Sequence, residues 1–532
     1  MKNKSILKTI ICILISIIQY FIYLPPINFS SPKFYSYLFV ILFVYAFLSV
    51  LFNSTNIKLG QPLTIDKSIF KSRIFIIIIT IILIQSAAKI IYSPILVSKL
   101  YAERITIDQG DFQQDIPEVD PNSLPLLDRL STERIGDRVM GEIPELISQF
   151  IVSDEYTQIN YKSNLIRVTP LEYADFFRWL FNKENGIPGY IKVTSTTGES
   201  DFVNVKGGIN YSPSAIFFKN INLHLRLSFP TLELSTPRFE IDEDGNPYWI
   251  TSVISYKGIG MLQDVSHVIE TNAITGENVL YKVGEVDKWI DNVYPSNLVI
   301  QQIDDWGTYQ GGFINSIIGK RDVKVSTTGY TYLTTGDDVS LYTGITSVTK
   351  DESNIGFVLV NLRNKNATYY PAPGAQEYSA MHSAKGAIQE KQYIPTFPLL
   401  TNVDGLPTYL LSLKDNAGLV KAYALVDVAD YQKVVVTDSM YGIQQAIDDY
   451  RHYMGKDIIV EGNNITIGTI VEIYDAVVDG NTYYYMTIID DDNIYKADIS
   501  INDILPFIKV NDQIEIKYDD NLYISNINRL SK

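Results

Sequence analysis

Thr9–Ile27 has the sequence TIICILISIIQYFIYLPPI, and two more apolar runs follow it: Phe34–Phe52 (FYSYLFVILFVYAFLSVLF) and Ile74–Val97 (IFIIIITIILIQSAAKIIYSPILV). Each run approaches or exceeds the roughly 20 apolar residues that a helix needs to cross the core of a bilayer. The first run is too long for the apolar core of a signal peptide, and no small-residue cleavage site follows it. The sequence therefore predicts a transmembrane anchor over residues 1–97, with spans at about 9–27, 34–52 and 74–97.

Charge divides the 532-residue chain at nearly the same point. Residues 1–100 hold 10 Lys and Arg and a single acid, Asp66, whereas the other 432 residues hold 34 basic and 59 acidic residues, a net charge of −25. Hydrophobic residues make up 46% of the chain, which excludes disorder of the whole chain. One Cys and 4 His exclude a disulfide framework and a Cys-based zinc site.

Basic residues also predict the orientation of the anchor. Three lysines lie within residues 2–8, Lys33 is alone in the first loop, and four basic residues lie within 58–73. Because cytoplasmic loops carry the excess of Lys and Arg, the N-terminus and the second loop should be cytoplasmic. Residues 98–532 should then be extracytoplasmic. The composition, rich in Ile, Asn, Lys and Tyr, is typical of a bacterium with an AT-rich genome, so we expect a multi-pass protein of a bacterial plasma membrane.

Two residues inside the predicted spans have alternative interpretations. In one interpretation, Lys89 is an ion site or a contact to another membrane protein. In the other, which we prefer, its side chain extends to the lipid headgroups. Cys12 is interpreted as a small apolar residue of the first span, with palmitoylation as the alternative that we do not prefer.

The pattern after the anchor predicts a β-rich α+β ectodomain of several modules. We expect a juxtamembrane linker over 98–125, an α+β module over 126–240, β-rich modules over 241–376 and 377–455, and a small β-barrel over 456–532. Apolar spacing near 3.6 residues predicts helices at 127–147 (interrupted near Gly141–Pro144), 171–182, 377–390 and 441–453. Between 187 and 436, strands and turns should otherwise prevail, with the helix at 377–390 as the one interruption.

A weak internal repeat links two of these modules. Asp244–Ile250 (DGNPYWI) and Asp404–Leu410 (DGLPTYL) share the pattern Asp-Gly-x-Pro-x-aromatic-aliphatic, and each opens a predicted strand. Asp-Gly favours a tight turn with positive φ, which predicts the same hairpin in both modules. The tetrapeptides Thr197–Ser200 and Thr275–Asn278 are similar Thr-Gly-Glu turns between strands.

The segment His267–Glu277 (HVIETNAITGE), with its helix, hairpin and Thr-Gly-Glu pattern, resembles PepSY modules, small extracytoplasmic α+β units implicated in protease inhibition and envelope signalling. The resemblance covers about 40 residues per copy. The chain over 100–455 also resembles uncharacterised multi-span membrane proteins of Firmicutes with a large extracytoplasmic domain. Neither resemblance implies a catalytic residue.

The last module alternates apolar and polar residues through Ile465–Val478 and Thr482–Ile489, with a helical connector (INDILPFI) before two further strands. Five short strands with one helical insertion resemble an OB-fold. Many such barrels bind single-stranded nucleic acid, but this module has 6 Lys and Arg against 14 Asp and Glu. Its charge would repel phosphate, so nucleic acid is excluded as a partner.

Candidate sites are few. Asp242, Asp244 and Asn246 begin like a calcium loop, but Pro247 and Val253 stand where an EF-hand needs Gly and Glu, so an ordinary turn is the preferred interpretation. The segment GFINSIIGK (312–320) lacks the spacing of a phosphate loop, and His382 lacks a nucleophile motif around it. The tryptophans Trp249, Trp289 and Trp306 are expected in the core, with sugar stacking as the alternative.

These observations predict an envelope protein that acts by binding, scaffolding or regulating other envelope components, with no catalysis, no catalytic residue and no cofactor except a weak calcium site. The bilayer and envelope proteins are its expected partners. The alternatives are an extracytoplasmic hydrolase of cell-wall glycan or peptide, and an accessory subunit of a transporter or secretion machine, in which Lys89 and its small neighbours would pack between helices.

Overall fold

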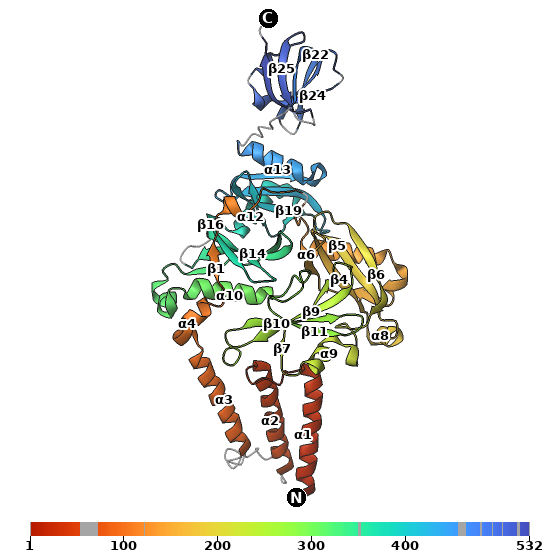
Figure 1. Ribbon diagram of the computed structural model, residues 1–532, viewed down its shortest axis with the longest axis vertical. Coiled ribbons are helices and arrows are strands. Elements are labelled where there is room, and N and C mark those ends of the chain that lie inside the picture. Colours follow the sequence, from red (N-terminus) through yellow and green to blue (C-terminus); the bar gives the residue numbers. More distant parts are fainter. Residues whose placement is uncertain are drawn as a thin grey trace. The chain divides into compact units, whose positions relative to one another are not determined.

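The computed structural model describes residues 2–53, 73–121, 123–348, 353–455, 464–478, 481–491, 493–502, 504–518 and 522–530 (Figure 1). The chain forms two compact units, Met1–Ile443 and Gln444–Lys532. The division falls within the predicted helix at 441–453, before the predicted boundary at 455/456.

The N-terminal helices α1 (Lys2–Tyr23) and α2 (Pro32–Asn53) are each long and apolar enough to cross a membrane. The third predicted span is broken: α3 (Arg73–Ile91) and α4 (Pro94–Ala102) meet at an angle of 57°. A proline at the start of α4 cannot continue the hydrogen bonding of α3, which accounts for the break. The described residues therefore contain two candidate spans, or three if the bent pair is one. Most of the basic second loop lies outside the described residues.

The described residues of the first unit form four β-sheets that share one strand order. In each, two short strands pair end to end along one long strand, and two further strands follow in antiparallel order. A helix precedes each sheet in the sequence. We call these units repeats 1 to 4 (residues 129–209, 221–282, 296–375 and 377–438).

The elements of repeats 1 and 2 have these bounds. Repeat 1 comprises α6 (Arg129–Gly141), α7 (Pro144–Ile147), β2 (Phe150–Val152), β3 (Thr157–Tyr161), β4 (Asn164–Tyr173), α8 (Phe176–Asn182), β5 (Ile187–Thr194) and β6 (Ser200–Ile209). Repeat 2 comprises α9 (Ile221–Ser228), β7 (Glu233–Leu234), β8 (Arg238–Ile241), β9 (Pro247–Ser255), β10 (Asp264–Asn272) and β11 (Asn278–Lys282), and the short helix η2 (Phe217–Lys219) precedes it.

Repeats 3 and 4 follow the same plan. Repeat 3 comprises α10 (Ser296–Tyr309), α11 (Gly312–Ile314), η3 (Asn315–Gly319), β12 (Lys324–Ser326), β13 (Thr331–Thr335), β14 (Asp338–Ser347), β15 (Ser353–Asn361) and β16 (Ala367–Ala375). Repeat 4 comprises α12 (Glu377–Ala387), η4 (Gln389–Lys391), β17 (Ile394–Pro395), β18 (Leu399–Val403), β19 (Leu406–Lys414), β20 (Val420–Asp427) and β21 (Val434–Asp438). The sequence predicted a shared hairpin in two modules, whereas the structure has four sheets of the same order.

Equivalent turns support this repetition. Between the last two strands of repeats 1, 2 and 3, the N–H groups of Thr194, Asn272 and Asn361 each donate to the carbonyl five residues later, at 2.8 to 2.9 Å. The fifth residue of each turn has positive φ: 77° at Gly198, 78° at Gly276 and 65° at Lys365. The predicted Thr-Gly-Glu turns therefore occupy equivalent places. The two Asp-Gly turns also occupy equivalent places in their repeats, because they connect β8 to β9 and β18 to β19.

Two secondary-structure predictions need correction. Residues 187–436 contain α9 and α10 in addition to α12. In α10, Leu298, Val299, Ile303 and Trp306 form a buried stripe with the helical period, although polar residues separate them in the sequence. The predicted helix at 171–182 begins only at Phe176, because β4 continues to Tyr173 and the Asp175 carboxylate caps α8 by accepting from the N–H groups of Phe177 and Arg178.

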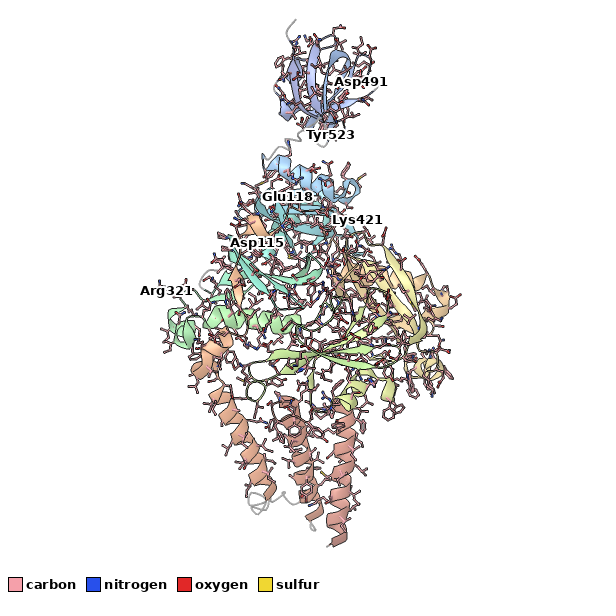
Figure 2. All side chains as sticks on the ribbon, viewed as in Figure 1. Asp115, Glu118, Arg321, Lys421, Asp491 and Tyr523 are labelled. Carbon is pink, nitrogen blue, oxygen red and sulfur yellow. The ribbon has the colours of Figure 1, made fainter. Side chains whose placement is uncertain are left out.

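The stretch predicted as a linker, 98–125, contains part of α4 and takes part in the fold. Within it, β1 (Ile107–Gln109) pairs in parallel with β16, and α5 (Phe112–Asp115) buries Phe112 in the core between repeats 3 and 4. Glu118, labelled in Figure 2, accepts a hydrogen bond from the N–H of Asp404 at 3.0 Å. The polar, proline-containing sequence of residues 98–125 did not indicate these contacts. A short strand pairs through its backbone groups and therefore needs no apolar pattern.

The second unit begins within α13 (Gly442–Tyr453) and contains one five-stranded sheet in the order β24-β23-β22-β25-β26. Its strands are β22 (Asn464–Val478), β23 (Asn481–Ile488), β24 (Tyr495–Asp498), β25 (Gln513–Tyr518) and β26 (Ile524–Arg529), with the helical turns η6 (Ile499–Ile501) and η7 (Leu505–Phe507) between β24 and β25. The Lys496 N–H donates to the Leu522 carbonyl at 3.0 Å, and a parallel bridge joins Lys496 to Tyr523, which links the first and last strands of the sheet.

Candidate functional site

The first turn of α2 and the loop before it are held against repeat 2 by an ion pair and a hydrogen bond to one carboxylate. Lys33 Nζ lies 2.7 Å from the Glu233 carboxylate, and the Ser31 hydroxyl donates to the same carboxylate. Glu233 begins β7 and is 3% exposed, whereas Lys33 is 61% exposed. A buried carboxylate needs such partners, because burial without them would cost several kcal/mol.

A second group of bonds fixes the end of α1 itself. Arg226 of α9 is buried, and its Nε donates to the Leu24 carbonyl at 2.9 Å. Its Nη1 donates to the Phe229 and Leu232 carbonyls within the same repeat. Burial lowers the pKa of Arg226. Backbone bonds from Ile27 to Pro230 and from Gly260 to Ser30 complete the contact. The apolar hairpin and repeat 2 are therefore joined by specific polar contacts.

A cavity of about 1350 Å³ lies beside this joint, and we call it the α1 cavity. Its wall includes Phe21–Leu24 at the end of α1, residues 213–226 before and within α9, the strands β7 and β8, and the start of α10. Repeats 2 and 3 and the first apolar helix thus all contribute to one cavity.

The wall of the α1 cavity combines apolar and charged side chains. Phe217 and Phe218 are 65% and 72% exposed, and they lie with the apolar end of α1 on this wall. Lys33, Arg226, Glu233 and Arg238 provide its charges. A wall of this kind matches a ligand that has both an apolar part and a polar part, because each part then meets groups of its own polarity.

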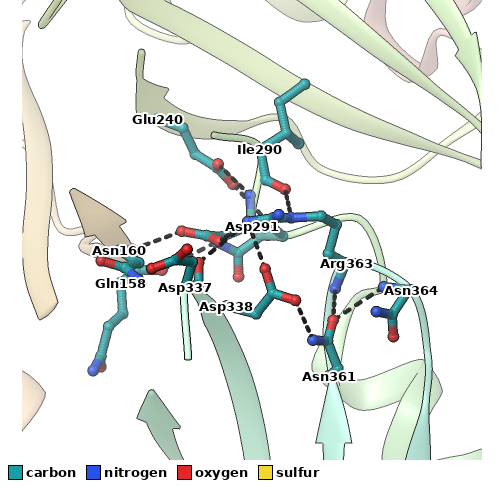
Figure 3. Close-up of polar contacts among 11 residues, drawn as sticks. Gln158, Asn160, Glu240, Ile290, Asp291, Asp337, Asp338, Asn361, Arg363 and Asn364 are labelled. Atoms are coloured by element: carbon teal, nitrogen blue, oxygen red, sulfur yellow. Dashed lines mark hydrogen bonds and ion pairs between the residues drawn. The ribbon is translucent and has the colours of Figure 1, made fainter. Parts of the chain in front are cut away.

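A buried acidic network lies elsewhere, where repeats 1, 2 and 3 meet (Figure 3). The Glu240 carboxylate of β8 accepts from the N–H groups of Asp291 and Asn292 at 3.1 and 3.2 Å. Asp291 accepts from the N–H of Asn160 in β3 at 2.6 Å and pairs with Arg363 at 3.0 Å. Burial raises the pKa of Glu240, and burial together with the neighbouring Glu240 carboxylate raises the pKa of Asp291.

This network has the perturbed acids of a catalytic site but not its access. Glu240 is 0% and Asp291 1% exposed, and neither lines the α1 cavity. Arg363, which also pairs with Asp338 at 2.8 Å, connects the acids to repeat 3. These contacts join repeats 1, 2 and 3, and we therefore interpret the network as a structural contact between repeats.

The calcium candidates lie in the turn between β8 and β9. The Asp242 carboxylate accepts from the N–H of Asp244 at 3.0 Å and of Asn246 at 2.8 Å, and from the Asn246 side-chain amide at 2.9 Å. The turn's own donors thus occupy this carboxylate. Among the described residues, no group of three or more His, Cys, Asp or Glu side chains is arranged to hold a metal ion. A calcium site here stays a prediction.

Other residues singled out in the sequence lie apart from the α1 cavity. His382 is exposed on α12, Trp249 and Trp306 are buried in the cores, and the segment 312–320 forms α11 and η3 rather than a phosphate loop. The residues that build the joint were not foreseen, because Lys33 and Glu233 are far apart in the sequence and neither belongs to a motif.

Comparisons with known proteins identify no family. No family model matches the chain, and no curated protein does. Two solved structures of single-residue variants of the Synechocystis apocarotenoid oxygenase align over 72% of this chain and 62% of theirs, at 8% and 7% identity. Both TM-scores are 0.13, so the likeness does not extend to a common fold.

Proposed function

We propose that this protein is a membrane-anchored, extracytoplasmic envelope protein that acts by binding and has no catalysis of its own. Its ligand is an amphipathic envelope molecule held in the α1 cavity, with the apolar part beside the end of α1. The observation that carries the proposal is the composition of that wall: the end of an apolar helix and charged residues of repeat 2 line one cavity. Such a cavity is accessible to a molecule that resides in the bilayer.

Exposed apolar side chains beside the helix ends support contact with a membrane surface. Phe217 and Phe218 lie by the end of α1, and α11 packs against α4, which follows α3. In and after α11, Ile314, Ile317 and Ile318 are 73%, 56% and 81% exposed. Clusters of exposed apolar residues on soluble proteins mark interaction or membrane surfaces.

The repeated architecture supports a binding role over an enzymatic one. Four units of one strand order offer several similar surfaces to envelope partners, and they are compatible with PepSY-like modules. The second unit is compatible with an OB-like barrel, because its strand order and the parallel bridge at Lys496 fit a closed five-stranded barrel with a helical insertion between its third and fourth strands. The alternative of a hydrolase gains no comparable support from the pair Glu240 and Asp291, because both acids are enclosed.

Purification of the full-length protein from its native membrane in a mild detergent tests the proposal. Mass spectrometry of the organic extract should find one amphipathic molecule at close to one per chain. An unrelated multi-span protein prepared in the same way is the control for bulk lipid. An extract with the same lipid composition as the control would contradict the proposal, as would turnover of a wall substrate that a single point substitution abolishes.

A further inference from the structure

A second cavity, of about 580 Å³, lies where all four repeats meet, and we call it the junction cavity. Residues of β3, β8, β13 and β18 line it. These are the equivalent strands of repeats 1 to 4, each the second short strand of its sheet. The junction cavity is therefore a product of the repetition, and it exists only when the four repeats are assembled.

The junction cavity is lined by three arginines, although the ectodomain is strongly acidic: Arg129, Arg167 and Arg238. Arg167, on β4, is 8% exposed. Its Nη1 donates to the Leu127 carbonyl at 3.0 Å and to the Thr132 hydroxyl at 3.1 Å, and its Nε and Nη2 donate to the Gln158 amide oxygen. All these partners are neutral. A buried guanidinium with neutral partners carries a desolvation cost that a bound anion would offset.

Acidic neighbours compensate part of this positive charge: Arg129 pairs with Glu133 at 2.7 Å, and the Glu155 carboxylate interacts electrostatically with Arg238 and Arg129. Arg238 Nη1 donates to the Asn292 amide oxygen at 3.2 Å, again a neutral partner. The buried amide nitrogen of Gln158 has no hydrogen-bond partner among the described residues, which adds an unused donor. The carboxylates on the wall are Asp128 and Glu155, and Asp128 is engaged by Lys414 at 2.5 Å and by the Ser131 N–H at 2.9 Å.

We infer that the junction cavity binds a small soluble oxyanion, a phosphate- or carboxylate-bearing molecule, through Arg167 and Arg238. Guanidinium groups present paired donors that match both groups. Because the cavity draws one strand from each repeat, the bound anion would also stabilise the assembly of the four repeats. The α1 cavity and the junction cavity share Thr236 and Arg238 on their walls, so the two sites adjoin.

Titration calorimetry of the full-length protein in detergent, with inorganic phosphate and with acetate, tests the inference. Saturable binding of at least one oxyanion is expected, with sodium chloride at equal ionic strength as the control. The dissociation constant should rise about tenfold or more in Arg167→Gln and in Arg238→Gln, since a charged hydrogen bond is lost. Circular dichroism of both variants verifies their folding, and Arg238→Gln provides the test if Arg167→Gln does not fold.

Two further variants define the specificity of this result. Arg178→Gln removes an exposed arginine of repeat 1 that pairs with Asp175 outside the cavity, so it should bind as the parent does. Asn222→Trp alters the α1 cavity alone and should also leave the affinity unchanged, which separates this inference from the proposed function. Absence of saturable binding in the parent, or equal affinity in the parent, Arg167→Gln and Arg238→Gln, would overturn the inference.

Discussion

Glu233, at the start of β7, and Lys33, in the first turn of α2, form an ion pair of 2.7 Å across the joint between the apolar hairpin and repeat 2. The Ser31 hydroxyl donates to the same carboxylate, which is almost fully buried. This relationship fixes one wall of the α1 cavity, because Lys33 and Glu233 both line it. The binding site proposed here depends on the joint remaining closed.

Glu233→Gln should loosen the joint without unfolding the repeats. We expect the free energy of unfolding to fall by about 1–2 kcal/mol, because the charge that holds Ser31 and Lys33 is lost while an amide acceptor remains. Hydrogen exchange over residues 24–33 should become faster. Glu243→Gln, in the exposed turn after β8, is the control. Unchanged exchange over 24–33 in Glu233→Gln would contradict this role.

Gly276→Ala should destabilise repeat 2 more than a substitution at a comparable glycine. Gly276 has φ of 78°, and a Cβ there would lie 2.2 Å from the Tyr211 ring. Gly284 has φ of 90° and no atom within 4 Å of its Cβ position. Both variants carry backbone strain, so Gly284→Ala should cost about 1 kcal/mol and Gly276→Ala about 2–4 kcal/mol. Equal denaturation midpoints would show that the contact is not tight.

The acidic network should make stability depend on pH. The pKa values of Glu240 and Asp291 are raised in the folded protein, so the folded state binds protons more tightly than the unfolded state. Their contribution is therefore complete below the ordinary carboxyl pKa, about 4.3, and is lost as pH rises through the raised folded values. Glu240→Gln removes one acid, and it also removes the neighbouring charge that helps to raise the pKa of Asp291.

Denaturation of the parent and Glu240→Gln at a series of pH values from 4 to 9 measures this effect. The variant should be less stable at pH 4, because an amide donor then faces a backbone N–H. The parent should lose about 1–3 kcal/mol more than the variant over the series. Parallel stability curves would be inconsistent with raised pKa values in this network.

Asp242→Ala tests the calcium prediction and the turn together. Three hydrogen bonds to the Asp242 carboxylate organise the turn before β9, so the variant should be about 1–2 kcal/mol less stable in the presence of a chelator. Thermal denaturation with and without millimolar calcium completes the test. If the turn is purely structural, calcium has no effect on either protein, whereas a stabilisation that Asp242→Ala abolishes would establish the metal site.

Local patterns in the sequence were sufficient for the two apolar helices α1 and α2 and for the turns, but not for the break between α3 and α4. The apolar runs predict α1 and α2, because bilayer length and hydropathy are properties of contiguous residues. The interruption near Gly141–Pro144 is confirmed by the separation of α6 from α7. Two Asp-Gly and two Thr-Gly-Glu turns indicated related hairpins. The strand order that unites four sheets could not be predicted, since repeat 1 shares only its Thr-Gly-Glu turn with another repeat and repeat 3 shares only backbone geometry.

The candidate site was beyond prediction for a different reason. Arg226, Glu233 and Arg167 are ordinary residues in their local sequences, and their burial follows from contacts with residues far away in the chain. Similarly, β1 pairs with β16, although Ile107 and its partner Ala367 are far apart in the sequence. Long-range contacts of this kind leave no periodic pattern in the sequence. The calcium-like loop, in contrast, has a local pattern of acidic residues, and the hydrogen bonds of its own turn explain that pattern.

Native mass spectrometry of the full-length protein, released from detergent micelles, tests the central claim most directly. Asn222→Trp places a large ring on the wall of the α1 cavity, and Leu227→Trp places the same ring on the exposed surface of α9 away from it. The account predicts one amphipathic adduct per chain in the parent and in Leu227→Trp, and its loss in Asn222→Trp. The same adduct in all three proteins, or in none, would contradict it.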